Sequence, residues 1–144
     1  MLGSGFQWVR PPSTLVRGIR RYERQVLATV HAVAAYVGQK MQDEGRANAP
    51  WHDRTGNARS GLFFAVDGFG LPTLTGQVSA GAAAQQGGVT IEEGDRGTLI
   101  VVFGHTVYYG KYLEMAHGQK YAIVMSTVER NLPVLERMMK RALS

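Results

Sequence analysis

Histidines are the side chains best suited to bind a metal or to move protons in this sequence. His105, Glu114 and His117 come closest to a set of metal ligands. Their spacing does not match a zinc signature, such as two histidines at positions i and i+4 of one helix beside a glutamate. His31 has neither a histidine nor a carboxylate at i±4, and the chain contains no cysteine. We therefore expect no metal site, no thiolate chemistry and no disulfide.

Motifs for nucleophilic catalysis and for phosphate binding are also absent from the sequence. Ser60 lies outside any G-x-S-x-G elbow and has no evident base partner. The glycines at 68 and 70 precede a proline and a strand-like segment, not the helix that a dinucleotide site requires. Glu92 and Glu93 would point to opposite faces of a strand, so they do not form an acid–base pair. We predict that the protein is not an enzyme, with no catalytic residue and no cofactor.

The net charge of +5 lies entirely in residues 1–59, which carry nine basic and four acidic side chains. Most of the excess comes from Arg17, Arg20, Arg21 and Arg24, which share one face of a helix at i, i+3, i+4 and i+7. Such a face suits nucleic-acid phosphates or an acidic protein surface, and it is equally common as a plainly solvated face. Aromatic residues are not interleaved with the basic ones as a base-stacking platform requires.

A long helix is predicted from about residue 14 to residue 48. Apolar residues recur there at steps of three and four: Leu15, Ile19, Tyr22, Val26, Val30, Val33, Val37 and Met41. Ser13 or Thr14 is the predicted N-cap, and Gly38 marks a candidate bend. At ~45 Å, this helix is longer than a domain of this size buries along its whole length. We expect part of it to pack against something outside its own core.

The rest of the chain predicts a small sheet and a closing helix. Expected strands are 62–66, a short one near 74–78 within a long loop at 67–88, and a hairpin of 89–93 with 98–103, the last as a central strand. A helix begins near residue 122 and either kinks or restarts at Pro133. The fold class is α+β: a long N-terminal helix, an antiparallel sheet of three to four strands with a long Gly-rich loop, and a C-terminal helix packed on the sheet.

Residues 1–13 form an extended arm and 14–144 a single domain. Phe6 and Trp8 of the arm fold back or dock on a neighbouring subunit.

The segment 48–62 is the most specific part of the sequence. Pro50 must end the first helix, and Trp51 is expected to cover the helix–sheet junction. Asp53 suits an Asx turn, and Thr55 suits the cap of one helical turn that Gly61 terminates. Arg54 and Arg59 flank this turn, and Glu114 is a candidate ion-pair partner for one of them.

Over residues 14–144 the chain resembles the neck, or tail-completion, proteins of tailed bacteriophages, a family of minor tail components at the head–tail joint. The resemblance rests on three motifs in order: GRANAP at 45–50, TGNARSG at 55–61 and YGKYLE at 109–114, continuing to Gly118 before a closing helix. It implies a non-enzymatic ring subunit, a hexamer, between the head-closure and tail-terminator rings, made in the bacterial host cytoplasm and located in the virion. Its partners would be copies of itself and adjacent neck and tail proteins, with no membrane.

In this interpretation the four helix arginines contact an adjacent ring or face the channel through which DNA passes. The candidate interface residues are Phe6, Trp8, Arg17, Arg20, Arg21, Arg24, Trp51, Arg54, Arg59, Tyr109, Tyr112 and Glu114. The alternative is a basic nucleic-acid-binding accessory protein, whose affinity for duplex DNA would fall steeply with salt.

Overall fold

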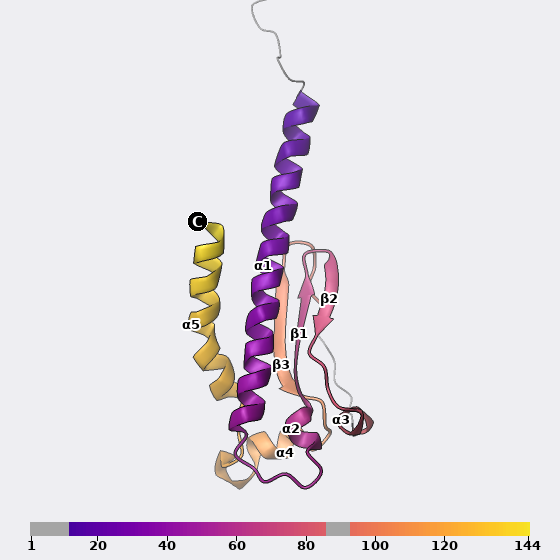
Figure 1. Ribbon diagram of the computed structural model, residues 1–144, viewed down its shortest axis with the longest axis vertical. Helices are drawn as coiled ribbons and strands as arrows, with labels where there is room; N and C mark the ends of the chain where they lie inside the picture. The colour runs from indigo at the N-terminus through magenta and orange to yellow at the C-terminus, as the bar shows by residue number, and fades with distance from the viewer. Residues whose placement is uncertain (1–11, 86–92) are drawn as a thin grey trace, which may run out of the picture.

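The computed structural model describes residues 12–85 and 93–144 (Figure 1). The predicted arm residues Phe6 and Trp8 lie outside the described residues, as does the predicted strand 89–93 except for Glu93. The described elements are α1 Pro12–Asn48, α2 Asn57–Ser60, β1 Leu62–Gly68, β2 Leu71–Thr75, α3 Ala80–Ala84, β3 Leu99–His105, α4 Gly110–Met115, a 3-10 turn His117–Gln119 and α5 Val124–Leu143. This order confirms the predicted α+β class, with a long first helix, a small antiparallel sheet and a closing helix.

Helix α1 is 37 residues long, or ~55 Å, and extends well past the sheet and α5 in Figure 1. It begins at Pro12, so the predicted N-caps Ser13 and Thr14 lie inside its first turn instead. Proline suits that first position because its missing N–H has no partner there in any case. At the other end α1 stops at Asn48, two residues before Pro50, as the sequence predicts.

The sheet has the order β2-β1-β3, and both pairings are antiparallel. Among the described residues β1 is central, and β3 has β1 as its described neighbour. The strand predicted to pair with β3, residues 89–93, lies outside the described residues except for Glu93, so the central position of β3 stays a prediction. Residues 62–66 of β1 are all buried, whereas every residue of β3 is partly exposed. The apolar run could not show which strand is more buried, because both β1 and β3 contain one.

The predicted long loop at 67–88 is also corrected by the structure. Its described part contains β2, which forms a hairpin with β1, and the short helix α3. The short strand predicted near 74–78 is present as β2, which begins three residues earlier. Strand β2 is mostly exposed and contains Pro72, so its sequence lacks the apolar alternation that identifies a strand.

The core lies between α1 and the sheet. Ala34 of α1 packs against Phe64 and Val66 of β1, with Val101 and Phe103 of β3 beside them. Gly38 is buried here and does not serve as a bend: a β-carbon on it would lie only 2.8 Å from Cγ of Phe64. The glycine therefore permits the close approach of the strand to the helix.

Helix α5 lies mainly alongside α1, with fewer contacts to the sheet at β3. A polar network joins the two helices: Asn131 of α5 donates to Glu44, 2.9 Å, and accepts from Lys40, 3.0 Å. Helix α5 runs without a break from Val124 to Leu143, so it does not restart at Pro133.

Candidate assembly interface

The elbow, residues 48–61, connects α1 to β1 and is built around Trp51. The Trp51 side chain is buried against Leu62 of β1 and Ile123 at the start of α5. This confirms that it covers the helix–sheet junction. Most of the Trp51 surface is thus used within the chain, although Trp51 also lines the hollow beside Tyr109.

One helical turn, α2, forms the second half of the elbow as the sequence predicts. Its N-cap is Gly56, in the left-handed region at φ 79°, and the Thr55 hydroxyl accepts from the N–H of Asn57 at 3.3 Å. Gly61 ends the turn, and its N–H donates to the carbonyl of Asn57 at 2.8 Å. The cap residues thus hold the chain in the reversal that leads into β1.

Arg59 stabilises the elbow through contacts with other residues of the same chain. Its guanidinium donates to the Asp53 carboxylate, 2.9 Å, and to the backbone carbonyl of Arg46 at the end of α1. Asp53 therefore forms an ion pair instead of the predicted Asx turn. Arg59 makes an inter-element contact, so it is not a free interface residue, while Arg54 is exposed beside it.

Two residues of α1 that the sequence analysis overlooked fix the sheet to the helix. Arg46 donates to the carbonyls of Ser60, Leu62 and Gln77 at 2.8, 2.9 and 2.6 Å. Gln42, one turn earlier and 1% exposed, donates to the carbonyls of Leu62 and Gln77. Burial lowers the pKa of Arg46 below its ordinary value. The available signal was their i, i+4 spacing on the apolar side of the last turns of α1.

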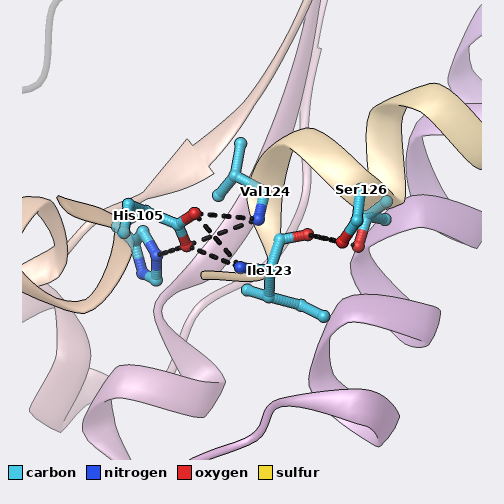
Figure 2. A network of polar contacts seen from close by, with 6 residues as sticks. His105, Ile123, Val124 and Ser126 are labelled. Carbon is cyan, nitrogen blue, oxygen red and sulfur yellow. Dashed lines mark hydrogen bonds and ion pairs between the residues drawn. The ribbon is translucent and has the colours of Figure 1, made fainter. Parts of the chain in front are cut away.

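Glu114 of α4 organises the start of α5, and Figure 2 labels its partners His105, Ile123 and Val124. It accepts the N–H groups of Ile123 and Val124 at 3.1–3.3 Å and contacts Nε2 of His105 at 2.8 Å. The predicted ion pair of Glu114 with an arginine is wrong. The carboxylate instead satisfies N–H groups at a helix N-terminus, where negative charge is stabilising. Glu114 is thus a structural cap at the start of α5.

The histidines are dispersed by the fold. The His105 ring faces Trp51, with 5.9 Å between ring centroids, whereas His117 stacks edge-on against Tyr121 at 5.8 Å. Within residues 12–85 and 93–144, no group of three or more potential metal ligands is found.

The two candidate tyrosines differ in their surroundings. Tyr109 lines a hollow of about 450 Å³ together with elbow residues 51–58, Gln85 and Leu113, and burial raises its pKa. Tyr112 is exposed, with the Lys111 ammonium 5.2 Å from its ring centroid. Tyr112 and Arg54 therefore remain surface candidates near the elbow, and Tyr109 forms one wall of the hollow.

The four arginines lie at the opposite end of the molecule, on the protruding segment of α1, residues 13–25. Every side chain from 15 to 25 is exposed, Arg17, Arg20, Arg21 and Arg24 among them. The opposite face of the same segment is apolar: Leu15 is 62%, Ile19 58% and Tyr22 68% exposed. This face of the segment is an exposed apolar surface, a feature that often marks an interaction site.

Comparison with known proteins identifies no relative: no family model, no curated protein and no solved structure matches this chain. In the part of the chain that the structure describes, no helix combines the length and the apolar character needed to cross a membrane.

Proposed function

We propose that this protein is a non-enzymatic structural subunit of the head–tail junction of a tailed bacteriophage. It would form a neck, or tail-completion, ring, a hexamer, that joins the head-closure ring to the tail-terminator ring. The virion would be its final location, and copies of itself and the adjacent ring proteins its partners.

The observation that carries this proposal is the protruding segment. About three turns of α1 stand clear of the domain with a continuous apolar face, at a position that no described part of the chain covers. A ring subunit has neighbours on both sides and above and below, and so has partners for such a surface.

The motifs of the resemblance also have a shared structural role. The TGNARSG motif forms α2 and its caps, and Glu114 of the YGKYLE motif caps α5. Arg46 of the GRANAP motif bonds to the carbonyls of Ser60 and Leu62. All three motifs set the angles between α1, the sheet and α5. This supports a scaffold whose function depends on the relative placement of its surfaces.

The test is head–tail joining. Phage particles would be produced from a genome that lacks the gene for this chain, and heads and tails would be collected separately. Addition of the purified protein is expected to restore joined, infectious particles, counted as plaques and by electron microscopy. Normal joining without the chain, or separate heads and tails after its addition, would overturn the proposal.

A second candidate, a basic nucleic-acid-binding accessory protein, is favoured by the exposed arginine face of α1. It predicts binding to duplex DNA with a salt dependence that becomes shallower when Arg17, Arg20, Arg21 and Arg24 are changed to glutamine. Joining activity that survives those four changes would favour the structural role.

A further inference from the structure

The elbow hollow is the space of about 450 Å³ that residues 51–58, Gln85, Tyr109 and Leu113 enclose. We propose that it binds an acidic segment of an adjacent neck or tail protein, in which a large apolar side chain lies beside a carboxylate. The apolar side chain enters the hollow, and the carboxylate meets Arg54. This proposal rests on the ring subunit proposed above, and it names the chemistry that a neighbouring protein presents to it.

The hollow forms where two segments far apart in the sequence meet. Residues 51–58 of the elbow line one part of it, and Tyr109 and Leu113, at the start of α4 and within it, line another. In Figure 1 this is the end of the molecule opposite the protruding segment. Ligand pockets in proteins commonly measure about 300–1,000 Å³, so the hollow has room for a large side chain and the backbone that carries it.

The apolar part of the hollow has a fixed position in the fold. Ala58 and Leu113 both line the hollow, and both pack against the buried cluster of Trp51, Leu62 and Ile123. Neither Ala58 nor Leu113 is fully buried, so each leaves apolar surface for a ligand. An anchor side chain that fills a preformed apolar hollow is the kind of contact that carries most of the binding energy at protein interfaces.

Arg54 gives the hollow its charge preference. Among the described lining residues Asp53 alone is acidic, and its charge is offset by the ion pair with Arg59. Arg54 is exposed and takes part in no ion pair within the described part of the chain. A guanidinium at the edge of an apolar hollow matches a carboxylate beside an apolar group. It disfavours a cationic segment.

Tyr109 adds a hydrogen-bond donor to the wall of the hollow. Its ring packs edge-on against Tyr108, with 5.2 Å between ring centroids. Burial raises the pKa of Tyr109, so its hydroxyl keeps its proton at neutral pH and is able to donate to a carboxylate or a peptide carbonyl.

A protein segment fits the hollow better than a nucleic acid does. Binding of a nucleic-acid backbone depends on several cations that each neutralise a phosphate. The hollow offers one unpaired arginine next to apolar walls, whereas the row of arginines lies at the other end of the molecule. One charge beside an apolar hollow suits a single carboxylate with an apolar neighbour.

Two small probes of the same shape test the site directly. Isotope-labelled protein would be titrated with 3-phenylpropanoate, which joins an apolar ring to a carboxylate, and with the neutral 3-phenylpropanamide. The anion is expected to bind in the millimolar range, with amide chemical-shift changes confined to residues 51–58 and 109–113. The neutral probe is expected to bind about tenfold more weakly. Equal binding of both probes, or shifts centred elsewhere, would overturn the proposal.

A matched pair of arginine variants assigns the charge preference. Arg54→Gln is expected to reduce the tenfold preference to about onefold, because it removes the charge that meets the carboxylate. Arg96→Gln removes the same charge from an exposed arginine beside Gly70, beyond the end of β1 that lies away from the elbow, and should keep the preference. A preference that survives Arg54→Gln, or that is lost equally in Arg96→Gln, would contradict the site.

A filled hollow provides a second measurement that leaves Arg54 in place. Ala58→Leu adds apolar volume to the lining and is expected to weaken binding of both probes at least about fivefold. Amide signals outside the elbow should stay at the parent positions, which shows that the variant folds. Unchanged binding in a folded Ala58→Leu protein would overturn the placement of the apolar side chain in the hollow.

The docking proposal and the head–tail role fail separately. Where the parent protein restores joining, Arg54→Glu is expected to lower the number of joined particles at least about tenfold. Full joining by the Arg54→Glu protein would overturn docking at the hollow and leave the head–tail role intact. Probe binding by a parent protein that restores no joining would overturn the head–tail role and leave the site. Loss of self-assembly in Arg54→Glu protein, measured by light scattering, would show that a second copy occupies the hollow, against the proposal.

Discussion

The apolar stripe of α1 is buried in one half of the helix and exposed in the other. Between residues 31 and 45, positions such as Ala34, Val37 and Met41 are covered by the sheet and by α5. Between residues 15 and 22, Leu15, Ile19 and Tyr22 continue the same stripe, and each is more than half exposed. Both halves repeat apolar residues at steps of three and four.

The same apolar periodicity therefore has different consequences in the two halves of α1. In the later half the stripe stabilises the monomer, because the chain supplies the surface that covers it. In the earlier half Leu15, Ile19 and Tyr22 are mostly exposed, so the stripe stabilises the monomer much less there. The two halves are therefore expected to respond differently to the same kind of substitution.

Removal of apolar volume should give the largest contrast. Met41→Ala leaves a cavity in the core and is expected to lower the free energy of unfolding by about 2–5 kcal/mol. Ile19→Ala is expected to change it by less than about 0.5 kcal/mol while it weakens assembly. Urea unfolding measures the free energy of unfolding of each variant, at protein concentrations where stability no longer depends on concentration. Light scattering measures the loss of assembly. Equal losses of stability in both variants would show that the protruding segment folds against its own domain.

Substitution of alanine for the two glycines of α1, Gly38 and Gly18, is expected to change stability in opposite directions. Gly38→Ala places a methyl group against the Phe64 ring and is expected to cost about 1–3 kcal/mol. Gly18→Ala meets nothing within 4 Å and is expected to stabilise the helix by roughly 0.8–1 kcal/mol. Thermal unfolding of both variants followed by circular dichroism measures the difference. A stabilising Gly38→Ala would show that the strand and the helix do not approach closely.

The smallest expected effect is the response of the buried half to acid. The hydrogen bonds from Lys40 and Asn131 hold the pKa of Glu44 below its ordinary value of 4.5. The resulting stabilisation is present above pH 4.5 and is lost as the pH falls through the lower pKa of the folded state. Glu44→Gln should therefore flatten the fall in stability below pH 4.5 by less than ~1 kcal/mol.

The control for this acid response is Glu23→Gln in the exposed half, which should follow the parent curve. The measurement is urea unfolding between pH 3 and pH 6. A Glu44→Gln curve that matches the parent throughout would contradict the assigned role of Glu44.

The elbow shows how far sequence reasoning reached and where it stopped. The end of α1 before Pro50 and the single turn of α2 were predicted, because each depends on neighbours in the sequence. The burial of Trp51 was predicted from the large apolar surface of its side chain. The partners of Arg59 and Glu114 were not. Arg59 bonds to Asp53, and Glu114 to His105 and to the N-terminus of α5. A charge alone does not specify which of several opposite charges or backbone dipoles will lie within reach.

The sequence by itself determined the amphipathic helices, the turn chemistry of the elbow and the α+β class, since periodicity and capping act over a few residues. Only the tertiary structure decided that β1 is central among the described strands, that Gly38 is a close-packing site, and which half of the α1 stripe is covered. These outcomes depend on contacts between residues far apart in the chain, and a local pattern of apolar residues is the same whether or not a partner covers it.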